Sequence, residues 1–135
     1  MAYRLTFTDP RLFEFCYNGF HQTAMATTRE EHIISNRILD KFESISLPDV
    51  ANRAVPGFPA ENAEMPRMRS LKPEGGFIIL EDAQFQYLRS ALERIRCIPQ
   101  ASRVVEQLYG LLDGAPHGDA KDLVTETWAA KAAAG

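Results

Sequence analysis

Cys16, His21 and His32 are the residues of this chain whose types could perform nucleophilic chemistry. A thiolate beside an imidazole is the pair used by cysteine-dependent enzymes, and Cys16 and His21 lie only five residues apart. Cys16 falls within an apolar pattern, however, and no neighbouring charge would lower the pKa of its thiol. We therefore interpret Cys16 as a core residue and the two histidines as surface residues. A small thiol-dependent enzyme is kept as an alternative hypothesis.

The spacing of the two cysteines and three histidines does not indicate a metal site. Zinc sites are usually built on pairs such as C-x-x-C or H-x-x-x-H, and neither occurs in this chain. We expect no metal and no cofactor, and we expect Cys16 and Cys97 to be free thiols in a reducing compartment. The paired carboxylates at 30–31 and 81–82 precede predicted helices, where negative charge is stabilised by the helix dipole.

Two small basic clusters could contact phosphate groups, one with Arg67 and Arg69 and the other with Arg94 and Arg96. They support a second alternative hypothesis, a nucleic-acid-binding regulator that holds the phosphate backbone with these four arginines. The net charge of −3 lacks the basic excess that is typical of nucleic-acid-binding domains. We therefore interpret the arginines as solvated surface charges and do not favour nucleic acid as the partner.

Length and composition predict one ordinary globular domain. The 135 residues are 45% hydrophobic and 24% charged, which is enough apolar material to form a core without a metal or a disulfide. No apolar run approaches the roughly 18 residues needed to span a bilayer, so no membrane association is expected. The N-terminus does not resemble an export signal, which predicts a cytoplasmic location.

The elements that position these residues begin with a strand over residues 3–7, where apolar and polar residues alternate. Asp9 followed by Pro10 predicts the start of a helix, because Asp accepts hydrogen bonds at the N-cap and Pro fits the first turn. A longer helix should follow the overlapping capping boxes within residues 27–31 and stop at Pro48.

Four aromatic residues lie between Phe13 and Phe20, more than one core-facing stripe of a helix usually needs. We expect most of them in the core. The surplus face is a candidate surface for a partner.

A hairpin and two helices should organise the middle of the chain. The residues PEGG at 73–76 have the composition of a tight reversal and predict a hairpin of residues 67–71 and 77–80. An apolar stripe from Phe85 to Ile95 predicts a helix, which Pro99 separates from a second one. The second helix should end at Gly114 in a left-handed cap, and the pair should be antiparallel or steeply crossed.

Two segments outside this frame are the candidate partner surfaces. Residues 46–66 are rich in proline, show no helical or strand period and are expected to be anchored at Phe58 or on a partner. Residues 115–135 form a helical appendage that needs a surface to lie on, either its own domain or another subunit. The residues assigned to partner binding are Phe58, Met65, Leu123, Val124 and Trp128.

Residues 38–45 (ILDKFESI), 71–76 (LKPEGG) and 80–85 (LEDAQF), with the helix pair up to Gly114, resemble small accessory proteins encoded among the morphogenesis genes of tailed bacteriophages, including tail-assembly chaperones. The resemblance covers residues 34–114 and carries no catalytic or metal signature. It implies a non-enzymatic role in the cytoplasm of a bacterial host, with phage structural proteins or host proteins as partners.

The sequence therefore predicts an α+β fold with a small three-stranded antiparallel sheet, formed by residues 3–7, 67–71 and 77–80, covered by about four helices. Residues 1–114 form the domain and 115–135 the appendage. The leading functional hypothesis is a protein–protein interaction module, such as a phage assembly chaperone or an inhibitor of a host factor. The appendage, with Trp128 in the interface, is expected to make the protein a symmetric dimer.

Overall fold

The computed structural model describes residues 1–58, 65–96 and 99–124, and within them the fold is α+β, as expected. No described helix is long and apolar enough to cross a membrane. The elements, in chain order, are β1 (Ala2–Phe7), α1 (Pro10–Thr23), α2 (Arg29–Ser44), β2 (Ser46–Pro48), β3 (Arg69–Leu71), β4 (Gly76–Glu81), α3 (Asp82–Leu92), the 3-10 turn η1 (Pro99–Ala101), α4 (Ser102–Asp113), β5 (His117–Gly118) and α5 (Ala120–Leu123).

Strand β1 is the centre of the main sheet, which has the order β4-β1-β5 with antiparallel pairing on both sides. The register places Leu5 opposite Ile78 and Phe7 opposite Gly76. The expected hairpin of residues 67–71 and 77–80 was wrong, because β3 pairs with β2 in a separate two-stranded sheet. The third strand of the main sheet is β5, near the end of the described chain.

The reversal at residues 73–76 does form, although it does not join two paired strands. The N–H of Gly75 donates to the carbonyl oxygen of Lys72 at 2.8 Å, and Gly75 has a φ of +75°. Lys72 in turn donates its N–H to Ile45 at the end of α2. The turn therefore carries the chain from β3, beside the end of α2, to β4, beside β1.

Helices α1 and α2 begin at the predicted caps. A side-chain oxygen of Asp9 accepts the N–H of Arg11, and Pro10 occupies the first turn. Of the two possible capping boxes, the structure uses Thr28, whose hydroxyl accepts the N–H of Glu31 at 3.1 Å.

Phe42 on α2 is the centre of an aromatic core. Its ring is fully buried and lies about 6 Å from the rings of Phe13, Tyr17 and Phe20 on α1, at centroid distances of 6.0, 6.1 and 6.1 Å. Phe7 of β1 closes the cluster from the sheet side at 6.4 Å. The ring contacts around Phe42 therefore join α1 and α2 to the sheet.

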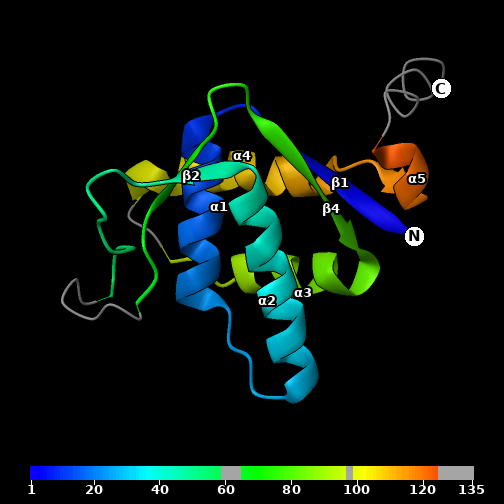
Figure 1. The fold of residues 1–135 in the computed structure, drawn as a ribbon, viewed down its shortest axis with the longest axis horizontal. Helices are drawn as coiled ribbons and strands as arrows, with labels where there is room; N and C mark the ends of the chain where they lie inside the picture. Colours follow the sequence, from blue (N-terminus) through cyan, green and yellow to red (C-terminus); the bar gives the residue numbers. More distant parts are fainter. Residues whose placement is uncertain (59–64, 97–98, 125–135) are drawn as a thin grey trace.

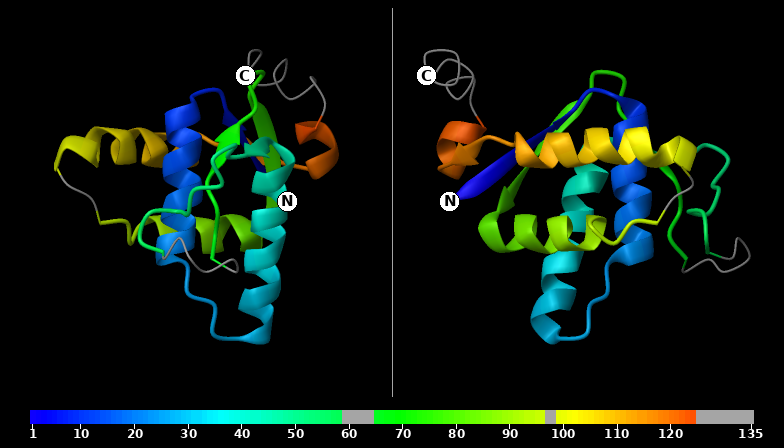
Figure 2. Two further views of the ribbon diagram at one scale, coloured as in Figure 1. Left: turned by 60° about the vertical axis from the view of Figure 1, so that its left-hand side comes forward. Right: turned by 180° about the vertical axis from the view of Figure 1, so that it is seen from behind.

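Helices α1 and α2 run side by side in opposite directions, and α3 and α4 cross behind them (Figures 1 and 2). Seen from behind, α3 and α4 are antiparallel, as expected for the pair (Figure 2). Helix α3 ends at Leu92, so Ile95 lies beyond the helix and not on its stripe. Gly114 ends α4 with a φ of −91°, so the expected left-handed cap was wrong.

The described part of the proline-rich segment is more regular than expected. Strand β2 lies within it, and the ladder with β3 continues through a bridge between Ala54 and Arg67. The N–H of Val55 donates to the carbonyl oxygen of Pro66 at 2.9 Å, and the Val55 side chain is fully buried. Val55 is therefore the main anchor of this segment.

Candidate functional site

Cys16 and His21 do not form an activated pair. Cys16 is fully buried, and burial raises the pKa of its thiol well above the usual range. His21 was expected at the surface, but it lies between aromatic rings, with the Tyr17 ring 4.6 Å away, and burial lowers its pKa to about 4. Only His32 is exposed as expected. A buried thiol that stays protonated does not fit nucleophilic catalysis.

Arg69 of the first basic cluster, together with the nearby Lys72, donates hydrogen bonds to the end of helix α2. Nη2 of Arg69 donates to the carbonyl oxygens of Ser46 and Glu43, and Nε of Arg69 donates to the hydroxyl of Ser46 at 2.8 Å. Nζ of Lys72 donates to the carbonyl oxygen of Ser44 at 3.1 Å. Cations are stabilised at the negative end of a helix dipole, so both side chains have a structural role at this end.

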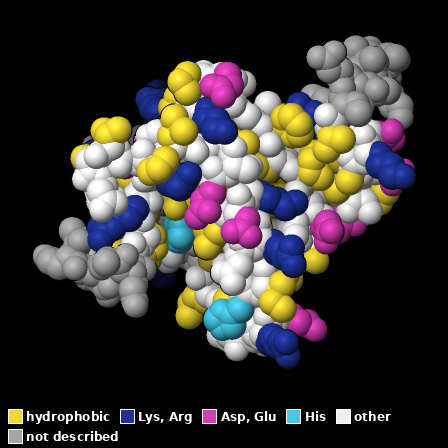
Figure 3. All heavy atoms as spheres, viewed as in Figure 1, with side chains coloured by type: hydrophobic (Ala, Val, Ile, Leu, Met, Phe, Trp, Pro, Cys, Tyr) yellow, Lys and Arg dark blue, Asp and Glu magenta, His cyan; other side chains and the backbone are white. Residues whose placement is uncertain are grey.

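The second cluster, Arg94 and Arg96, lies just beyond the end of α3. Both arginines lie past the end of α3 at Leu92, and Nε of Arg94 donates back to the carbonyl oxygen of Ser90 in its last turn. On the face seen in Figure 3, positive and negative side chains are interspersed, without a continuous stripe of one sign. Among the described residues, no group of three or more His, Cys, Asp or Glu side chains could hold a metal ion.

The residues assigned to partner binding are not gathered in one place. Phe58 is half-buried and packs against the core, and Met65 is also half-buried. Leu123 is 3% exposed within its own chain, whereas Val124 is 53% exposed. Leu123 is therefore already used in the fold and is not offered to a partner. Trp128 lies outside the described residues.

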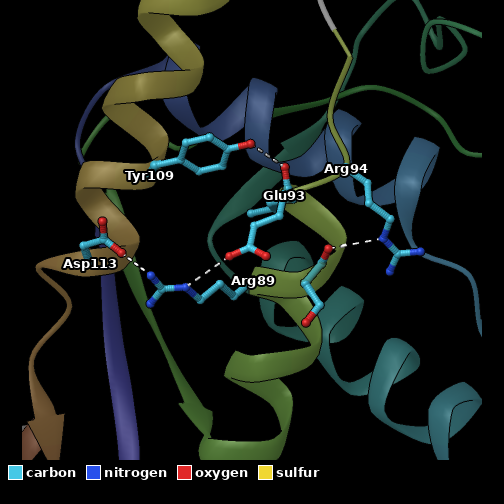
Figure 4. A network of polar contacts seen from close by, with 7 residues as sticks. Arg89, Glu93, Arg94, Tyr109 and Asp113 are labelled. Atoms are coloured by element: carbon cyan, nitrogen blue, oxygen red, sulfur yellow. Dashed lines mark hydrogen bonds and ion pairs between the residues drawn. The ribbon is translucent and has the colours of Figure 1, made fainter.

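Polar contacts join α3 to α4 along one side of the molecule (Figure 4). The guanidinium of Arg89 pairs with Asp113 on α4 and, at 3.6 Å, with Glu93 on its own helix. The hydroxyl of Tyr109 donates to the carbonyl oxygen of Leu92 at 3.0 Å, beside the end of α3. These contacts fix the spacing of the two helices and shape the surface around Tyr109.

Two hollows share Ile95 and Arg96, the residues that follow the end of α3. The larger hollow, of about 480 Å³, lies against α4 and is lined by Ile95, Arg96, Ser102, Val105, Glu106 and Tyr109. The smaller hollow, of about 220 Å³, lies against α1 and is lined by Phe15, Asn18, Gly19, Gln22, Pro56, Ile95 and Arg96. We refer to the two together as the Arg96 surface, and it is the candidate functional site.

The Arg96 surface combines apolar walls with an arginine that is not used by the fold. Phe15, Val105 and Ile95 supply apolar area, while Arg96 is exposed and makes no hydrogen bond or ion pair with another described residue. An aromatic or aliphatic wall beside an arginine is the composition typical of interface centres. No pair of groups here has the geometry of an acid, a base or a nucleophile.

A further hollow, of about 640 Å³, lies at the N-terminal ends of α3 and α5. Its lining includes the carboxylates of Glu81, Asp82 and Asp119 and the positively charged side chain of Lys121. Carboxylates at helix N-termini have a structural role. The lining of this hollow has a larger polar share than the Arg96 surface, and its apolar side chains are Met1 and three alanines.

Sequence reasoning missed the Arg96 surface, although it held one relevant signal. The surplus of aromatic residues on α1 was interpreted as a candidate partner face, and Phe15 is the residue that leaves the core and lines the smaller hollow. Ile95 was assigned to the stripe of α3 and therefore to the core.

Comparisons with protein-family models, curated proteins and solved structures find no match to this chain.

Proposed function

We propose that this protein is a non-enzymatic protein–protein interaction module and that a segment of a partner protein docks on the Arg96 surface. The observation that carries the proposal is the pair of adjacent hollows with apolar walls on either side of an arginine that the described fold does not use. The occupant that fits is an extended polypeptide segment with apolar side chains for the hollows and a negative group for Arg96. The buried Cys16 argues against the alternative of a thiol-dependent enzyme.

Site-specific photo-crosslinking tests this docking surface. A photoreactive side chain is introduced at Glu106, an exposed residue of the larger hollow, and at Gln107, its exposed neighbour on α4 that does not line the hollow. Because adjacent residues of a helix point about 100° apart, the two positions report on different faces. We expect an adduct with a partner in native cell extract from position 106 only. Equal adducts from both positions, or none from either, would contradict the proposal.

The resemblance to tailed-phage accessory proteins supports a more specific proposal, an assembly chaperone or an inhibitor of a host factor acting in the bacterial cytoplasm. Its partner would be a phage structural protein or a host protein. Mass spectrometry of the adduct from position 106 identifies the partner, and a partner outside these two classes would contradict this part of the proposal.

We also propose that the protein forms a symmetric dimer. The proposal is supported by Val124, whose apolar side chain is half-exposed at the end of the described chain, and by the sequence after it, which contains Trp128. Burial of apolar area at about 25 cal/mol per Å² makes a tryptophan a strong interface residue. Light scattering should give twice the chain mass for the full protein and one chain mass for a version ending at Val124. Equal masses would refute the dimer.

A further inference from the structure

The smaller hollow is built to admit one apolar side chain. Phe15, Pro56 and Ile95 line its walls, and its volume is about 220 Å³. An apolar cavity of about 150 Å³ takes up a benzene molecule, so this hollow has room for one aliphatic or aromatic side chain with part of its main chain. Gly19 brings Ile95 close to α1, because a Cβ at Gly19 would lie only 2.7 Å from the Cδ1 atom of Ile95.

Two polar groups of this hollow have no partner among the described residues. Asn18 lines the hollow, and its side-chain oxygen is buried without a hydrogen bond and would face the hollow only after the amide rotates, whereas Arg96 is exposed and has no partner among the described residues. Buried acceptors are nearly always hydrogen-bonded, so the unsatisfied oxygen of Asn18 is consistent with a donor supplied by a ligand. The last torsion of an Asn side chain has a broad energy minimum, so the amide can rotate to meet that donor.

We propose that the smaller hollow binds the C-terminal residue of a partner polypeptide. Its apolar side chain lies among Phe15, Pro56 and Ile95, its carboxylate pairs with Arg96, and its main-chain N–H donates to the side-chain oxygen of Asn18. This inference rests on the proposed function, because it names the segment that an interaction module would bind at this surface.

A chain end fits this site better than an internal acidic residue. The cation, the acceptor and the apolar walls line one small hollow, and a C-terminal residue carries the matching carboxylate, N–H and side chain on a single Cα. In an extended internal segment, neighbouring side chains point to opposite faces, so an acidic side chain next to the anchored residue would point away from Arg96. The docked segment is therefore the end of a chain.

The test uses fluorescein-labelled Gly-Ser hexapeptides that end in Leu, Ile, Val, Phe, Asp or Lys, prepared both as free acids and as C-terminal amides. We expect the free acids with apolar ends to bind, and the corresponding amides to bind at least about tenfold more weakly, the size of one charge-assisted hydrogen bond. An amidated peptide ending in Leu-Asp represents the internal acid, and N-acetyl-leucine represents a free small molecule. Tighter binding of either one than of the Leu-ending free acid would overturn the inference.

Matched variants locate the binding. Arg96→Gln should abolish the preference for free acids, whereas Arg94→Gln, which removes an exposed arginine that does not line the hollow, should keep it. Unchanged melting temperatures confirm that both variants fold. Equal binding of acids and amides, an unchanged preference in Arg96→Gln, or no binding at millimolar peptide refutes the C-terminal site. Crosslinking at Glu106 is an independent result, so the interaction module can stand when this inference fails.

Discussion

Arg4 donates a hydrogen bond of 2.6 Å from Nη1 to the carbonyl oxygen of Leu123, which joins the first strand to the last described helix. The same guanidinium lies over the ring of Phe77, with Cζ 3.6 Å from the ring centroid. One side chain of β1 therefore contacts both β4 and α5 on the outer side of the sheet. This contact is a polar link between α5 and the domain.

Replacing Arg4 with Met should loosen α5 selectively. The loss of the hydrogen bonds to Leu123 and Thr6 and of the cation–π contact should lower the free energy of unfolding by about 1–2 kcal/mol. Hydrogen exchange of the amides at 117–124 should accelerate more than that of α1 or α2. Arg11→Met is the control, because Arg11 is exposed on α1, and it should leave exchange at 117–124 unchanged. Uniform acceleration across the domain would contradict a local role for Arg4.

Two glycine substitutions should have effects of opposite sign. At Gly75 the φ of +75° is strained for any side chain, and a Cβ would lie 2.7 Å from the carbonyl oxygen of Phe7. Gly75→Ala should therefore lower the free energy of unfolding by about 2 kcal/mol. Gly110 lies within α4 with open space around its Cα, so Gly110→Ala should raise that free energy by up to about 1 kcal/mol. Urea denaturation measures both changes.

His21 should make the fold sensitive to acid. Its folded-state pKa is about 4, below the usual value of 6.5, because burial disfavours the charged imidazolium. The unfolded chain then binds more protons than the folded one, so stability is fully present above pH 6.5 and falls as the pH drops toward 4. After allowance for its partial exposure, we expect a loss of about 2 kcal/mol from this residue.

His21→Gln should remove that part of the acid sensitivity, while the exposed His32→Gln should keep it. Urea midpoints between pH 7 and pH 4 test the difference. Equal pH dependence in His21→Gln and the unmodified protein would show that the imidazole is not buried in its neutral form.

Cys16 should be unreactive in the folded protein. Burial raises the pKa of its thiol, so almost no thiolate exists at neutral pH, and the side chain is fully enclosed. In a Cys97→Ser background, a thiol reagent should modify Cys16 only at the rate of unfolding. Rapid modification without denaturant would revive the hypothesis of a thiol-dependent enzyme.

Replacing Arg69 with Met tests whether this residue has a structural role or belongs to a phosphate-binding site. Arg69→Met removes the hydrogen bonds at the end of α2 and should lower the free energy of unfolding by about 1–2 kcal/mol. Retention on heparin at low salt should stay the same, because this guanidinium already has main-chain partners. A marked loss of retention at unchanged stability would favour the nucleic-acid hypothesis.

Local sequence signals predicted where helices begin and where the chain turns better than they predicted which strands pair. The caps at Asp9 and Thr28 depend on residues a few positions apart, so the sequence alone located the starts of α1 and α2. The turn chemistry around Gly75 likewise predicted a reversal. It could not predict that β4 would pair with β1, because strand pairing depends on which distant strand lies alongside.

The candidate site was harder to predict because its parts come from distant segments. The smaller hollow needs Phe15 and Asn18 on α1, Pro56 after the β2 segment, and Ile95 beyond the end of α3. The predicted stripe of α3 extended to Ile95, but the helix ends three residues earlier, and Ile95 packs half-buried at the edge of the core. Arg69 was misassigned for a similar reason, since its partners at the end of α2 lie 23 and 26 residues away in the chain.

The central position of β1 has a consequence for folding during synthesis. Its two partner strands, at 76–81 and 117–118, are made long after β1 itself. At roughly 5–20 residues per second, β1 must wait several seconds for β4 to leave the ribosome. During that time Leu5 and Phe7 have no strand to pair with, so the growing chain exposes this apolar strand until residues 76–81 are made. Sheet formation is therefore a late, long-range step, and the folding rate should be limited by it.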